Sequence, residues 1–278
     1  MSSNGLVEEH YTSGRLVQKI TTALATLGKA PRTVTIDDLA PVDEFHIGGR
    51  QATEEIVGQL NLSRNDHVLE IGSGLGGAAR FVADRFGCRV SGIDLTGEYV
   101  ETGRVLNEWV GLAARIAFHH GSALDTTFDD AAFDAAYMLH VGMNIADKER
   151  LFAEVARVLK PGATFAIYDV MTTGGETLDF PVPWARGPET SAVATPVAYK
   201  AALTAGGFKI VAERNRRDFA IEFFENLRAR TVRADGPPPL GLHMVMGADA
   251  ATKIANMIGD IEEGRVAPVE IFARRGPG

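Results

Sequence analysis

The clearest feature of the hydrophobic pattern is a short apolar run that leads directly into a glycine-rich turn. The run covers residues 68–71, and the turn at residues 72–77 contains four glycines. Apolar residues then recur at helical spacing from Ala78 to Phe86, and Gly87 ends this pattern. The pattern predicts a strand, a tight turn and a helix. Glycine suits this turn because backbone N–H groups approach a ligand closely only where no Cβ intervenes.

The rest of the chain alternates between short apolar runs and segments with helical periodicity, which predicts an α/β fold. A stripe formed by Leu16, Ile20, Leu24 and Leu27 predicts a covering helix near the start, and the polar run up to Asp38 is expected to break it. Further strands are expected at 89–94, 115–120, 133–139, 164–170, 208–213 and 265–273, and further helices at 54–60, 99–112, 148–159 and 197–205. Residues 216–264 are expected to be mainly helical, with a break at 235–241.

A carboxylate ends the second strand, where nucleotide-binding sheets hold a ribose. Asp94 lies about twenty residues past the glycines and can accept both ribose hydroxyls. The glycine spacing alone fits the dinucleotide fingerprint equally well. Glu70, inside the first strand, and the segment Leu159-Lys-Pro-Gly162 favour another family. On these residues the chain resembles the class I S-adenosylmethionine (SAM)-dependent methyltransferases, in which an acid precedes the glycines and a Leu-Lys-Pro-Gly turn precedes the fifth strand.

The resemblance covers roughly residues 40–275 and implies a fold. This is a seven-stranded, doubly wound Rossmann-like sheet whose last strand is antiparallel, with a helical cap. Residues 1–62 are expected to form N-terminal cover helices, and residues 63–275 the SAM-binding domain. Substrate-cap insertions are expected at about 171–194 and 216–264.

The resemblance also implies S-adenosylmethionine as the cofactor. The segment 45–50 is similar to a stretch in sarcosine/dimethylglycine and phosphoethanolamine methyltransferases, which implies that Arg50 pairs with the methionyl carboxylate. Ser122 stands where the family usually has an acid that receives the adenine amine, so a charged acceptor is missing there. The expected cofactor contacts are Arg50, Glu70, Gly72, Ser73, Gly74, Gly76, Asp94, Leu95, Ser122, Ala123 and His140.

Two side chains are candidates for the chemistry. His140 follows the fourth strand and Asp169 lies near the carboxyl end of the fifth. Ligands of such sheets bind beyond the carboxyl ends of the strands, so both residues are expected to face one cleft. The segment 171–194, rich in Gly, Pro and Thr, is expected to cover this cleft. The candidates for substrate contact are Tyr11, His46, Trp184 and His243.

The composition and charge of the chain restrict the classes of molecule that it is expected to bind. The chain has 278 residues, of which 45% are hydrophobic, and a net charge of −8, which argues against nucleic acid or an anionic membrane as a partner. Cys88 is the single cysteine and no long apolar span occurs, so the cytoplasm is the expected compartment. No Cys/His spacing indicates a metal site. A small-molecule substrate is expected, and homo-oligomerisation is left open.

The expected reaction is methyl transfer from SAM to a small molecule, with an amine nitrogen as the first choice. The alternative is C-methylation of a prenyl diphosphate. In that scheme Asp169 and an aromatic face of Tyr137 or Trp184 stabilise a cation, and the arginine cluster at 228–233 holds the diphosphate. Two other classes are an NAD-dependent oxidoreductase and a non-catalytic SAM-binding protein, because a fold alone does not define a function.

Overall fold

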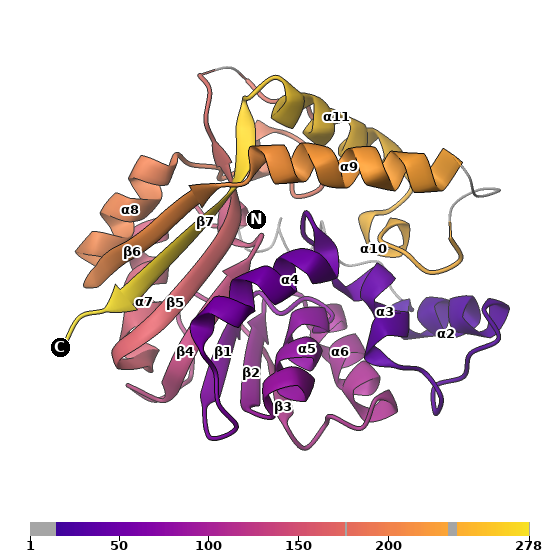
Figure 1. The fold of residues 1–278 in the computed structure, drawn as a ribbon, viewed down its shortest axis with the longest axis horizontal. Helices are drawn as coiled ribbons and strands as arrows, with labels where there is room; N and C mark the ends of the chain where they lie inside the picture. Colours follow the sequence, from indigo (N-terminus) through magenta and orange to yellow (C-terminus); the bar gives the residue numbers. More distant parts are fainter. Residues whose placement is uncertain (1–14, 176, 233–237, 278) are drawn as a thin grey trace.

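Seven strands form one sheet in the computed structural model, which describes residues 15–175, 177–232 and 238–277. The strand order is β3-β2-β1-β4-β5-β7-β6; β7 runs antiparallel to both of its neighbours, and the other pairs are parallel (Figure 1). The predicted seven-stranded Rossmann-like sheet with an antiparallel last strand is confirmed. The strands are β1 (His67–Ile71), β2 (Arg89–Asp94), β3 (Ile116–His120), β4 (Phe133–Leu139), β5 (Leu159–Thr172), β6 (Phe208–Asn215) and β7 (Val266–Arg275).

Strand β5 is longer than the predicted 164–170. Leu159 already pairs with Phe133, and the register then shifts so that Thr164 pairs with Ala135. The Lys-Pro-Gly segment is therefore an irregularity within the strand. At the other end, pairing with β7 extends β5 to Thr172, which lies opposite Val266.

Alternating side chains of the sheet supply two apolar layers. Val68 packs with the helices at 49–57, 77–86 and 97–109 on one face, whereas Leu69 and Ile71 pack with the helices at 148–158 and 196–205 on the other. The helices of these layers are α4 (Gly49–Val57), followed by the 3-10 turn η1 (Gly58–Leu60), α5 (Gly77–Phe86), α6 (Gly97–Trp109), α7 (Lys148–Val158) and α8 (Pro196–Ala205). Thr195 caps α8 through its side chain, as its position before a proline predicts.

The segment before the sheet contains two further helices, α2 (Leu16–Thr26) and α3 (Ile36–Asp43). Leu16, Ile20 and Leu24 are buried as predicted, but Leu27 is 48% exposed because the helix ends before it. The predicted break after the first helix is confirmed, since α2 ends at Thr26, but the break does not extend to Asp38 because α3 begins at Ile36. Thr35 and Asp38 form a capping box that starts α3, so their polarity serves a helix terminus.

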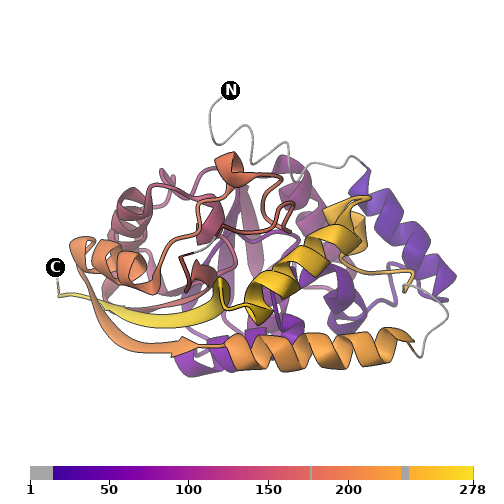
Figure 2. The ribbon, with the colours of Figure 1, turned by 90° about the horizontal axis from the view of Figure 1, so that it is seen from above.

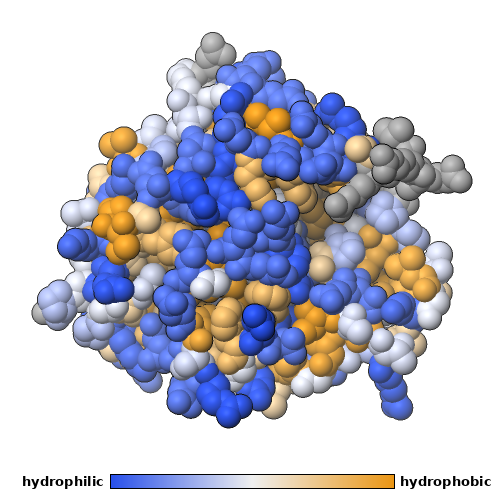
Figure 3. Space-filling model, viewed as in Figure 1, coloured by the Kyte–Doolittle hydropathy of each residue, from blue (hydrophilic) through white to orange (hydrophobic). Residues whose placement is uncertain are grey.

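A helical cap follows β6. It consists of α9 (Arg217–Val232), α10 (His243–Met246) and α11 (Ala250–Glu262), as the predicted helical region 216–264 implies. Helices α9 and α11 pack on each other and extend beyond the sheet (Figures 1 and 2). The segment between β5 and α8, which includes η3 (Pro188–Thr190), packs against them through the buried Trp184. On the face seen in Figure 3, hydrophilic side chains predominate and apolar ones form small groups. Within the described ranges, no helix is long and apolar enough to cross a membrane.

Candidate active site

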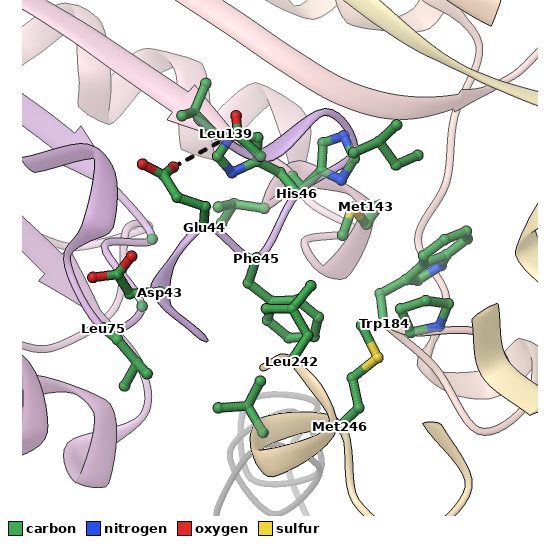
Figure 4. Close-up of a pocket in the computed structure, with 18 of the residues that line it drawn as sticks. Asp43, Glu44, Phe45, His46, Leu75, Leu139, Met143, Trp184, Leu242 and Met246 are labelled. Carbon is green, nitrogen blue, oxygen red and sulfur yellow. Dashed lines mark hydrogen bonds and ion pairs between the residues drawn. The ribbon is translucent and has the colours of Figure 1, made fainter. Parts of the chain in front are cut away.

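A cavity of about 1120 Å³ lies at the carboxyl ends of the parallel strands, between the sheet and the cap. This volume exceeds the roughly 300–1,000 Å³ that is common for the site of one small ligand, so it accommodates a cofactor together with an acceptor. Figure 4 shows part of its lining. The predicted site residues that line it are Arg50, Glu70, Gly72, Ser73, Gly74, Asp94, Leu95, Ser122, Ala123 and His140 from the cofactor and catalytic sets, and His46, Trp184 and His243 from the substrate set.

The glycine turn holds the Asp94 carboxylate at the cavity wall. The Gly74 N–H donates to Asp94 Oδ2 at 2.7 Å, and the Thr96 N–H donates to Oδ1 at 2.8 Å. Burial raises the pKa of Asp94, and these two backbone donors oppose that rise. Gly74 has a φ of 51°, and a Cβ built on it would meet nothing within 4 Å. An open cradle beside a fixed carboxylate with lone pairs to spare fits the ribose of SAM.

Burial also affects Glu70, which lies inside β1 beneath the turn. Burial raises the pKa of Glu70 well above 4.5, and the nearby Glu44 adds to the rise. Ser122 lines the cavity beyond β3, where its Oγ accepts a 3.2 Å hydrogen bond from the Leu124 N–H. The Ser122 hydroxyl keeps its own proton for a ligand acceptor.

Arg50 lies in the first turn of α4, which begins at Gly49 and not at residue 54 as predicted. Arg50 Nε donates to Glu44 Oε1 at 2.6 Å, and the guanidinium lies 5.0 Å from the centre of the Phe81 ring. Among the described residues, no partner reaches the buried Nη2 atom. A guanidinium fixed on one side with a free donor on the other fits a ligand carboxylate.

Two neutral imidazoles stand further along the same cavity. The ring centres of His140 and His46 are 6.0 Å apart, and His140 also lies 4.9 Å from the Tyr168 ring. His46 Nε2 is held 3.0 Å from the Gly49 carbonyl oxygen. Burial lowers the pKa of His46 to about 4 and that of His140 well below 6.5.

His140 has the free nitrogen of this pair. Its backbone has a φ of 55°, an uncommon conformation for a non-glycine residue and a frequent one at functional sites. The His140 N–H donates to the Tyr168 carbonyl at 2.7 Å and fixes this conformation. Its buried Nε2 has no hydrogen-bond partner in the described structure. A neutral imidazole with a free nitrogen can accept a proton from a bound molecule.

The prediction that Asp169 faces the cleft is wrong. Asp169 is fully buried inside β5, outside the lining of the cavity, and it accepts a 2.7 Å hydrogen bond from the Tyr199 hydroxyl. The strand continues to Thr172, so Asp169 lies within the sheet and not at its end. Burial raises the pKa of Asp169 to about 6, and the hydrogen bond from Tyr199 opposes the rise.

Other predicted residues are also absent from the cavity wall. Gly76, the residue before α5, has a φ of 86° and lies against Phe118, outside the cavity lining. Tyr137 is buried within β4, away from the lining. Arg228 is exposed and likewise does not line the cavity. Tyr11 and Arg233 lie outside the described residues.

Sequence reasoning missed Asn144 and Glu44. Asn144 lines the cavity in η2 (Gly142–Asn144), and its buried Oδ1 has no partner among the described residues. Its position in the loop after β4, which also carries His140, could have indicated it. Glu44 lies just before the segment 45–50, and only the fold reveals its ion pair with Arg50. Within the described ranges, no group of three or more His, Cys, Asp or Glu side chains could hold a metal ion.

Sheet order, glycine turn, ribose carboxylate and cavity together define the class I methyltransferase architecture. Comparison with known proteins agrees, since residues 69–167 match the family model described as a methyltransferase domain. A curated relative is the phosphoethanolamine N-methyltransferase of Plasmodium falciparum, which is 30% identical over 182 residues, 64% of this chain and 66% of that protein. Residues 69–167 therefore form a methyltransferase domain, and the chain is similar to the class I SAM-dependent methyltransferases, a family whose cofactor is S-adenosylmethionine.

Two solved structures share the fold over nearly their whole length. One, from Galdieria sulphuraria, is assigned as a sarcosine dimethylglycine methyltransferase; its TM-score is 0.69 at 19% identity, covering 94% of this chain and 99% of that one. The other is the geranyl diphosphate C-methyltransferase of Streptomyces coelicolor, with a TM-score of 0.71 at 18% identity, covering 99% and 98%. At these identities the likeness is one of fold. The chain spans about half the length of the first curated relatives that it matches.

Proposed function

We propose that this protein transfers a methyl group from S-adenosylmethionine to a small molecule whose reacting atom lies beside His140. One observation carries the proposal: a single cavity joins the Asp94 carboxylate to the free Nε2 of His140. The first is a ribose-type contact, and the second is a proton acceptor. The cofactor contact and the proton acceptor therefore face the same cavity.

S-adenosylmethionine supplies an activated methyl group when it is bound. The residues of this chain hold it at both ends: Asp94 accepts from the ribose, and Arg50 donates to the carboxylate. The acceptor must then lie in line with the methyl group at near-contact distance. Most of the rate enhancement of such a reaction comes from this positioning. The surrounding wall, which includes Trp184 and the cap, keeps water away from the reacting groups.

His140 receives the proton that the acceptor atom loses. Burial lowers the pKa of His140, which keeps its imidazole neutral, and in the Nδ1–H tautomer Nε2 carries the lone pair that takes the proton. The alternative of alkene C-methylation finds less support. It needs a carboxylate and an aromatic face beside a developing cation; Trp184 lines the cavity and offers such a face, but Asp169, the carboxylate of that scheme, and Tyr137 lie outside the lining. We therefore favour an acceptor with a proton on nitrogen or oxygen.

The test is turnover of SAM to S-adenosylhomocysteine with panels of hydroxyl, amine and prenyl diphosphate acceptors. With an accepted substrate, His140→Ala should reduce kcat by about 10²–10⁴-fold, the usual contribution of a positioned base. Affinity for S-adenosylhomocysteine should stay within about twofold of wild type, because His140 Nε2 faces the acceptor and not the cofactor in this proposal. His119→Ala, at a half-buried histidine of β3 outside the cavity lining, is the control. Full activity of His140→Ala would contradict the assigned role.

A further inference from the structure

We infer that the methyl acceptor is a bulky, uncharged and largely apolar molecule that presents a hydroxyl group to His140. This inference rests on the proposed function and adds the substrate class to it. The part of the cavity lined by Phe45, Met143, Trp184, Leu242 and Met246 is here called the acceptor chamber. The inference follows from three of its properties: its apolar wall, its charges, and its free polar atoms.

The wall of the acceptor chamber is apolar and comes from distant parts of the chain. Figure 4 shows Phe45, Met143, Trp184, Leu242 and Met246 gathered around one space. Trp184 is 2% exposed and Met246 is 8% exposed, so these side chains form an interior surface. Methionines adapt their shape and suit irregular apolar ligands. Such a wall gains free energy only from an acceptor that covers it with apolar atoms.

The chamber has no cation for a phosphate group. Among the described lining residues, Arg50 alone is an arginine or lysine, and Glu44 holds it at the cofactor end. Three imidazoles line the cavity: His46 and His140 are neutral because burial lowers their pKa, and the third, His243, is exposed. A phosphate or diphosphate would therefore lose its hydration without a partner, which is very costly.

A cationic acceptor meets the converse difficulty. Three of the lining carboxylates, Asp147, Glu189 and Glu222, are exposed to solvent. Glu44 and Glu70 are buried at the cofactor end. Glu44 already pairs with Arg50 at 2.6 Å and accepts from Thr53 at 2.7 Å. Burial raises the pKa of Glu70, which favours its neutral form. An ammonium group inside the chamber would thus remain unpaired. The charges favour an uncharged acceptor over both phosphorylated and ammonium compounds.

The free polar atoms in the chamber match a hydroxyl donor. His140 Nε2 and Asn144 Oδ1 are both buried and have no partner in the described structure. Asn144 Oδ1 is an acceptor, and His140 Nε2 is an acceptor in the Nδ1–H tautomer of the neutral imidazole, so both complement O–H groups and repel anions. In the reaction the O–H proton moves to His140 Nε2, an O–CH₃ bond forms, and the electron pair of the broken S–CH₃ bond stays on sulfur. The product is a methyl ether.

The binding preference of the chamber can be measured without turnover. The chain has two tryptophans, so Trp109→Phe leaves Trp184 as a fluorescence reporter of the chamber wall. The protein is saturated with S-adenosylhomocysteine and titrated with n-alkanols of six to ten carbons, and with the alkyl phosphates and alkylamines of equal length. Alkanol affinity should rise about fourfold per methylene, which corresponds to about 0.8 kcal/mol. Each alkanol should bind at least about tenfold more tightly than its charged counterparts, because burial penalises an unpaired charge.

A pair of variants on α11 locates the binding. Ile254 lines the chamber, whereas Thr252 is exposed and does not. Ile254→Lys should weaken alkanol binding and reverse the preference towards alkyl phosphates, and Thr252→Lys should change neither. Three results would each overturn the inference. Alkyl phosphates or alkylamines could bind wild type as tightly as the alkanols, the alkanols could fail to bind, or Ile254→Lys could leave the binding unchanged. Binding of S-adenosylhomocysteine is measured first by calorimetry. If it does not bind, the proposed function is contradicted, and the inference about the acceptor is not yet addressed.

Discussion

The Tyr199 hydroxyl donates a 2.7 Å hydrogen bond to Asp169 Oδ2, and the pair lies directly behind Gly142. Lys148 lies 5.0 Å from the centre of the Tyr199 ring and donates to the Ala192 carbonyl at 2.9 Å. These contacts join β5, α8 and the segment between them, which contains Ala192, to the η2 turn. This turn begins two residues beyond His140. Asp169 therefore supports the loop that carries His140 from outside the cavity lining.

Replacement of Tyr199 by phenylalanine should produce a pH-dependent loss of stability. The hydroxyl stabilises the ionised form of Asp169, whose pKa burial raises to about 6. At pH 8 the carboxylate is ionised and would lose its partner, so the free energy of unfolding should fall by about 1–3 kcal/mol. At pH 5 the carboxyl is largely protonated in the folded state, so the loss should be smaller. Urea unfolding at both pH values measures this difference.

Tyr168→Phe provides the control for that experiment. The Tyr168 hydroxyl donates to the Ile47 carbonyl at 3.1 Å, a neutral acceptor. Its removal should therefore cost the same at pH 5 and pH 8. Equal losses at the two pH values for Tyr199→Phe would show that the hydrogen bond does not depend on the charge of Asp169.

A second prediction concerns the glycine turn. Gly72 and Gly28 both have a φ of 69°, but a Cβ on Gly72 would clash with Val141, the neighbour of His140, whereas a Cβ on Gly28 would meet nothing within 4 Å. Gly28→Ala should cost about 1–2 kcal/mol from the left-handed backbone alone. Gly72→Ala should cost about 1–3 kcal/mol more, because the clash forces the buried loop to shift. Equal midpoint shifts in denaturant unfolding would contradict the close contact between the two loops.

A third prediction separates the two ends of the cofactor site. Arg50→Lys keeps the positive charge but loses the planar fork that binds a carboxylate. Affinity for S-adenosylhomocysteine should fall about tenfold to a hundredfold, as expected for hydrogen bonds to a charged group. Affinity for 5′-methylthioadenosine, which lacks the amino-acid carboxylate, should not change. Arg85→Lys, on the exposed side of α5, is the control. Equal losses for both ligands would remove Arg50 from the carboxylate site.

The cofactor half of the site could be predicted from sequence because its parts are local. The glycine turn and Asp94 follow consecutive strands, and β2 and β4 begin and end at the predicted residues. The acceptor half could not be predicted in the same way. Phe45, Trp184 and Met246 share no motif, and only the packing of the cap on the sheet brings them together.

The error at Asp169 has a similar cause. The apolar pattern of the fifth strand ends near Val170, which suggests that Asp169 lies at the carboxyl end of the strand and faces the cleft. Pairing with the antiparallel β7 extends the strand to Thr172, and this contact is far from local in sequence. A two-residue extension is enough to place the side chain inside the sheet. Strand ends that depend on distant partners are therefore the least predictable positions of this site.

The most direct test of the cofactor assignment is calorimetry of the wild-type protein and Asp94→Asn with S-adenosylhomocysteine and, in parallel, with NADH. Asp94 accepts hydrogen bonds on both carboxylate oxygens, and Asp84→Asn, at an exposed position of α5, is the control. We predict binding of S-adenosylhomocysteine but not NADH, and a loss of about 1–3 kcal/mol in Asp94→Asn. Binding of NADH alone, or unchanged affinity in Asp94→Asn, would contradict the assignment of this cavity to S-adenosylmethionine.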